Sequence, residues 1–105
     1  MSKPLLVRLE GIRSGDLLVR LYDEILRDVL LYEPLSPHEV DTLLRHERNE
    51  VYAAYLGREA IGLVAISFLE NRSGGCVSLL GVVKKYRGRG FSGQLPGFTL
   101  NRLKR

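Results

Sequence analysis

The sequence is short of several features, and each shortage excludes a class of protein. Its 105 residues include a single cysteine, Cys76, so no disulfide can form within the chain. No apolar run reaches the roughly 18 residues that a membrane-spanning helix needs. The N-terminal segment lacks the long apolar stretch and cleavage site of a signal peptide. We therefore expect one globular domain over residues 1–105, located in the cytoplasm.

Acidic residues are missing from the last part of the sequence. Residues 1–83 hold nine Lys or Arg and twelve Asp or Glu, whereas residues 84–105 hold seven Lys or Arg and no acid. The net charge of +4 is therefore concentrated near the C-terminal end, where it would attract anions. Phosphate groups of a small ligand and of a nucleic acid both suit this field, so charge alone does not choose between these partners.

The spacing of apolar residues predicts an α+β fold. Ala60 to Leu69 is almost continuously apolar, as expected of a central strand that is covered on both faces. Gly57-Arg58 is expected to form the two-residue turn before it. The expected elements, in chain order, are a strand over 4–12, a helix over 17–31, a short helix over 36–47, and strands over 51–56, 60–69 and 76–83.

The start of the second helix has a specific signal. Ser36 can accept a hydrogen bond as the N-cap, Pro37 suits the first helical position, and Glu39 completes a capping box. We therefore expect the helix to begin at this point and to end near Glu47.

The stretch from Leu79 to Gln94, LLGVVKKYRGRGFSGQ, contains the strongest functional signal. An apolar strand runs into a basic turn with two glycines, and a helical pattern follows. The first N–H groups of a helix have no partner within it, glycines let backbone approach a ligand closely, and Arg87 and Arg89 are good donors to phosphate oxygens. The stretch therefore predicts a phosphate site, most simply for a pyrophosphate. A solvated basic turn is the alternative.

Residues 86–92, YRGRGFS, resemble the acetyl-CoA-binding motif R/Q-x-x-G-x-G/A of GNAT-type N-acetyltransferases. Arg87 takes the first position and Gly90 the fourth, whereas Ser92 stands where the family prefers Gly or Ala. The resemblance implies a four-stranded, largely antiparallel sheet with helices between strands 1 and 2 and after strand 4. It covers about two-thirds of the family's domain, because the sequence ends where the family continues into a fifth strand, a fourth helix and a final hairpin.

The resemblance also implies a function and a set of site residues. Acetyl-CoA would be the co-substrate, and the acceptor would be the amine of a small molecule, a protein N-terminus or a lysine. A shortened relative that only binds CoA is a second reading, and a basic nucleic-acid-binding module or a dimerising remnant is the alternative. No catalytic base is identified. The residues expected to contact the cofactor are Leu80 and Val82 through backbone groups, and Arg87, Gly88, Arg89, Gly90 and Ser92 at the pyrophosphate.

Other reactive residues are expected to have structural roles. Cys76 is expected to be buried in its strand. His38 and His46 are eight residues apart, which does not suit a paired metal site, so we expect surface histidines and no metal. Tyr32 and Glu33 lie where the family lines its acceptor site, although an ordinary loop pair is the simpler interpretation. The strand from Cys76 to Val83 carries no charge and is expected to pair with a second copy in a homodimer.

Overall fold

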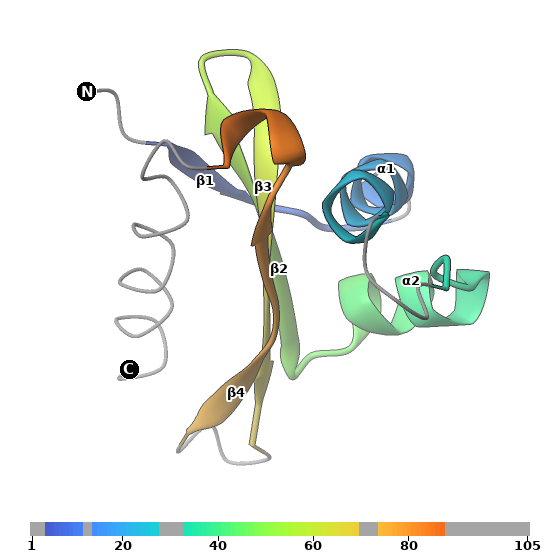
Figure 1. The fold of residues 1–105 in the computed structure, drawn as a ribbon. Coiled ribbons are helices and arrows are strands. Elements are labelled where there is room, and N and C mark those ends of the chain that lie inside the picture. Colours follow the sequence, from blue (N-terminus) through green and yellow to red (C-terminus); the bar gives the residue numbers. More distant parts are fainter. Residues whose placement is uncertain (1–3, 12–13, 28–32, 70–73, 88–105) are drawn as a thin grey trace.

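The computed structural model describes residues 4–11, 14–27, 33–69 and 74–87, which are drawn in colour in Figure 1. These residues form a four-stranded sheet with two α-helices on one of its faces, which confirms the α+β prediction. The elements follow in the order β1 (Leu5–Arg8), α1 (Gly15–Leu26), α2 (Pro37–Arg45), β2 (Asn49–Leu56), β3 (Glu59–Phe68), β4 (Gly75–Val82) and the short 3-10 helix η2 (Lys84–Tyr86).

Helix α1 packs one apolar stripe against the sheet. Leu18, Leu21 and Ile25 are buried at helical spacing, while Arg20 and Glu24 are exposed. Each buried side chain contributes roughly 1.5–3 kcal/mol through removal of apolar surface from water. The helix begins two residues earlier than predicted, and the end of the predicted range, at 28–31, lies outside the described residues.

Helix α2 begins as the sequence predicts. The backbone N–H of Glu39 donates to Ser36 Oγ at 3.1 Å, and the backbone N–H of Ser36 donates to Glu39 Oε1 at 3.1 Å. The pKa of Glu39 is lowered from its ordinary value of 4.5, chiefly by the bond from the Ser36 backbone. The last helical residue is Arg45 rather than Glu47, and the His46 N–H closes the final turn on the Thr42 carbonyl.

The strands lie in the order β1-β2-β3-β4, and each neighbouring pair is antiparallel. Gly57, at the turn between β2 and β3, has a φ of 64°, a conformation that glycine adopts without strain. β3 lies between β2 and β4 and is buried along nearly its whole length, as its apolar sequence predicts. β4 is the last strand of the sheet that the structure describes.

Cys76 is exposed, so the prediction of a buried cysteine is wrong. β4 is an outer strand of the described sheet, and its first half extends away from α1 (Figure 1). An apolar strand sequence therefore does not ensure burial there. Val77 and Leu80 are also exposed, at 41% and 38%.

His38 and His46 are exposed, as expected of surface histidines. Within the ranges given above, no three His, Cys, Asp or Glu side chains gather in a way that could hold a metal ion. None of the helices that the structure describes is long and apolar enough to cross a membrane. The helix expected after the fourth strand, in the segment that begins at Phe91, lies outside the described residues.

Candidate functional site

The outer edge of β4 presents backbone hydrogen-bonding groups. The Val83 N–H donates to the Ile61 carbonyl at 2.8 Å, so Val83 directs its backbone toward β3. Successive residues of an antiparallel strand direct their backbone groups to opposite sides. In the observed register, Leu79 and Gly81 therefore also point toward β3, whereas Leu80 and Val82 point to the outer edge. These two are the strand residues that the family resemblance singled out, and their contact with a cofactor stays a prediction.

A β-bulge divides this edge into two parts. Val77 pairs with Ile66 and Leu79 pairs with Ala65, so Ser78 is an extra residue without a partner in the register. Its hydroxyl donates to the Ala65 carbonyl at 3.3 Å. Bulges break the regular spacing of outward groups and bend the strand. The part from Leu80 to Val82 is therefore a short, separate run of outward donors and acceptors.

Helix α1 approaches β4 very closely at Gly81. A Cβ atom built on Gly81 would lie 2.6 Å from Ile25 Cγ2, which is closer than real Cβ contacts allow. Ile25 is only 5% exposed and has little room to move. The absence of a side chain at Gly81 therefore lets the last turn of α1 rest directly on the strand that presents the edge.

Arg87 fixes the same region through its guanidinium. Nε donates to the Val82 carbonyl at 3.0 Å, and Nη2 donates to the Ile25 carbonyl at 2.6 Å. The Ile25 carbonyl belongs to the last turn of α1, where helix carbonyls lack a partner within the helix and favour a cation. Arg87 thus ties the end of α1 to the outer edge of β4.

The other predicted phosphate-binding residues are not among those the structure describes. Gly88, Arg89, Gly90 and Ser92 lie outside the described ranges, so their assignment stays a prediction. Tyr32 also lies outside them, and Glu33 is exposed in the segment before α2.

The 3-10 helix η2 is held against the turn between β2 and β3. The Tyr86 hydroxyl donates to Glu59 Oε1 at 2.6 Å, and Lys85 Nζ lies 3.6 Å from Glu59 Oε2. The pKa of Glu59 is lowered from 4.5, chiefly by the Tyr86 hydrogen bond. η2 therefore has a defined position just before the predicted phosphate turn.

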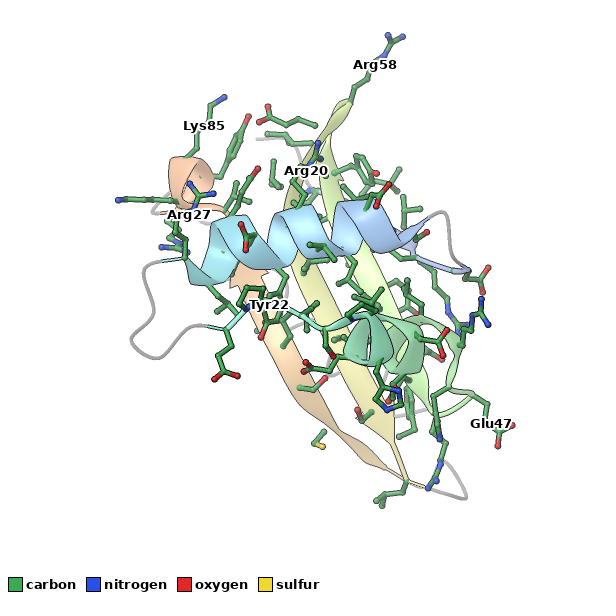
Figure 2. The ribbon with its side chains drawn as sticks, turned by 90° about the vertical axis from the view of Figure 1, so that its right-hand side faces the viewer. Arg20, Tyr22, Arg27, Glu47, Arg58 and Lys85 are labelled. Carbon is green, nitrogen blue, oxygen red and sulfur yellow. The ribbon has the colours of Figure 1, made fainter. Side chains whose placement is uncertain are left out.

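Charged side chains surround a groove of about 310 Å³ beside η2. Figure 2 shows two of them, Arg27 and Lys85, at this end of the molecule. The groove is lined by Glu24, Arg27, Glu59, Val83, Lys84 and Lys85. Because Glu24 and Glu59 balance part of the positive charge, the groove is not a simple anion site.

A buried carboxylate on β2 was missed by sequence reasoning. Glu50 is only 1% exposed; the Tyr52 hydroxyl donates to its Oε1 at 2.6 Å, and Arg8 Nη1 lies 3.9 Å from its Oε2. The signal was the alternation of Glu50 and Tyr52, which places both side chains on one face of β2. In the register Glu50 is level with Ile66 and Val77, so two strand spacings, about 10 Å, separate it from β4. Glu50 is therefore not a residue of the β4 edge.

No family model and no curated protein matches the sequence. Solved structures do match. An acetyltransferase from Thermus thermophilus is 19% identical at a TM-score of 0.78, and the match covers 95% of this chain and 69% of that one. A ribosomal-protein-alanine N-acetyltransferase from Brucella melitensis is 18% identical at a TM-score of 0.75, and the match covers 96% of this chain and 72% of that one.

A third structure is closer to this chain in length. A structure described as a GNAT family acetyltransferase from Staphylococcus aureus is 16% identical at a TM-score of 0.65, and the match covers 94% of this chain and 90% of that one. At these identities the likeness establishes the fold and no more. The chain has the fold of the GNAT acetyltransferases.

Proposed function

We propose that this protein binds acetyl-CoA along the outer edge of β4 and transfers the acetyl group to an amine. The observation that carries the proposal is the outward direction of the Leu80 and Val82 backbone groups, on a GNAT fold, immediately before a basic turn. The exposed free thiol of Cys76 suits the reducing cytoplasm, where we place the protein.

The residues present fit the cofactor. The pantetheine arm of CoA is an extended chain with two amide groups, and such a chain can pair with a strand edge as another strand would. The Val82 carbonyl is already engaged by Arg87, which leaves the Leu80 N–H, the Leu80 carbonyl and the Val82 N–H for the ligand. Two N–H groups of Arg87 are used within the protein, so its remaining donors, with Gly88, Arg89, Gly90 and Ser92, would take the pyrophosphate.

Acetyl transfer to an amine requires few catalytic side chains. The amine nitrogen forms a bond to the thioester carbonyl carbon, the carbon–sulfur bond breaks, the nitrogen loses a proton and the sulfur gains one. Positioning of the two reactants supplies much of the rate. The acceptor would be a small-molecule amine, a protein N-terminus or a lysine. A nucleic-acid-binding role is not favoured, because the structural likeness is to acetyltransferases.

The proposal is tested by proline substitutions at two adjacent residues. Leu80→Pro removes an N–H that points away from β3, so the sheet should survive, as proline is tolerated where a strand N–H faces outward. Acetyl-CoA affinity measured by calorimetry should fall at least tenfold. Leu79→Pro is the matched control: it removes an N–H that points toward β3, and it should lower the melting temperature. Unchanged acetyl-CoA affinity in folded Leu80→Pro would place the cofactor elsewhere.

We also propose that the strand from Cys76 to Val83 forms a homodimer, in competition with the cofactor. Both partners would use the outward groups of β4, and Val77 and Leu80 supply exposed apolar surface there. Light scattering after size exclusion should give about twice the monomer mass of 11.9 kDa without ligand, and a smaller mass with saturating acetyl-CoA. A monomer at all micromolar concentrations would rule out the dimer, and a dimer insensitive to acetyl-CoA would place its interface away from this edge.

A further inference from the structure

A second groove, away from β4, lies between the two helices. It has a volume of about 400 Å³ and runs between the first half of α1 and α2, which Figure 2 shows beside each other in front of the sheet. The volume lies within the range of small-molecule sites in proteins. The residues that line it are Gly11, Gly15, Asp16, Val19, Leu35, Pro37, Val40, Asp41, Leu44 and Arg45.

The floor of this groove is apolar. Val19, Leu35, Val40 and Leu44 are apolar residues of its lining, and Val19 is 37% exposed. The buried stripe of α1 faces the sheet, so Val19 belongs to a different side of that helix. An apolar body could therefore bind here without disturbing the core.

The rim of this groove carries two carboxylates, Asp16 and Asp41, and one guanidinium, Arg45. Asp41 and Arg45 neutralise one another, with Arg45 Nε 2.9 Å from Asp41 Oδ1. Asp16 stands in the first turn of α1, and no described residue forms a hydrogen bond or ion pair with its side chain. The groove thus combines an apolar floor with one carboxylate that pairs with no described side chain.

We propose that this groove binds a small amphiphilic primary amine, with its apolar body on Val19, Val40 and Leu44 and its ammonium group at Asp16. A charge-assisted hydrogen bond to a carboxylate is stronger than one to a neutral acceptor, so the ammonium group would orient the ligand. α2 packs over β2, and β2 is separated from β4 by β3, so this site is distinct from the proposed cofactor edge. The inference does not depend on acetyl transfer.

The test uses the full chain, labelled with ¹⁵N and titrated with 2-phenylethylamine. Amide shifts should concentrate on residues 14–20 and 35–45. The neutral analogue 2-phenylethanol should bind at least fivefold more weakly, and 3-phenylpropionate, which reverses the charge, should not bind measurably. Asp16→Asn should weaken amine binding about tenfold while leaving the alcohol unchanged.

Two further variants keep the result decisive. Glu24→Gln removes another exposed carboxylate of α1 that does not line this groove, and it should leave the affinity for the amine unchanged. Val19→Phe fills the groove from an exposed position and should weaken amine and alcohol alike. Equal affinity for the amine and the alcohol, shifts centred away from α1 and α2, or no shifts at millimolar amine would each overturn the proposal, as would stronger binding of the propionate.

Discussion

Gly81→Ala is expected to lower the free energy of unfolding by about 2 kcal/mol or more, in the upper part of the range for overpacked cores. The new methyl group would meet Ile25 Cγ2 at 2.6 Å. Ile25 is buried, and its carbonyl is held by Arg87, so neither the side chain nor the helix end can easily move away. Urea denaturation followed by circular dichroism measures the loss.

Gly74→Ala is the matched control. A Cβ atom at Gly74 would lie 3.7 Å from Leu69 Cδ1, an ordinary van der Waals contact, and its stability should change little. Ile25→Ala removes the clashing methyl group, so the double variant with Gly81→Ala should be more stable than the sum of the two single losses predicts. If Gly81→Ala proves as stable as Gly74→Ala, α1 does not rest on β4 as described.

Local sequence signals predicted much of this fold. The capping box of Ser36 and Glu39 and the turn at Gly57 depend on residues close together in sequence, so their geometry follows from residue type. The central position of β3 followed from its continuous apolar composition. The outward direction of Leu80 and Val82 required the register, although the family resemblance had already singled out these residues.

The features that sequence did not predict all depend on contacts between distant segments. In the sequence, Gly81 looks like an ordinary strand glycine. Its need for a missing side chain becomes visible only in the structure, where Ile25, 56 positions earlier, packs against it. Cys76 reads as a core residue until β4 is found at the end of the described sheet. Glu50 reads as a surface acid until the neighbouring strand and Tyr52 are in place. Residue type alone does not determine such tertiary environments.

Arg87 illustrates the same limit within the proposed site. Its position in the motif assigns it to the pyrophosphate, whereas the structure shows its guanidinium bound to two backbone carbonyls. One belongs to Val82 at the end of β4, and the other to Ile25 at the end of α1. A role in positioning the strand end and the following turn is therefore available to Arg87, in addition to any contact with phosphate.

Arg87→Ala is accordingly expected to weaken acetyl-CoA binding at least tenfold and to lower the free energy of unfolding by about 2 kcal/mol. Hydrogen bonds from a charged group contribute about 1.5–3 kcal/mol each, and we take less than their sum because Arg87 is exposed. Calorimetry with acetyl-CoA and urea denaturation measure the two effects separately. Adding Arg89→Ala should reduce affinity further.

Arg87→Lys separates the positioning role from the charge. Lysine keeps the positive charge but lacks the planar fork that reaches both carbonyls, so it should restore little stability. If Arg87 acts mainly by positioning, affinity in the lysine variant should stay close to that of the alanine variant at every salt concentration. If its charge on phosphate dominates, lysine should recover most of the affinity, and the recovery should fade as salt screens the charge. Both roles predict that Arg87→Ala binds acetyl-CoA more weakly, one because the strand end is no longer held in place and the other because a phosphate contact is lost. Full acetyl-CoA affinity in Arg87→Ala would therefore exclude both roles.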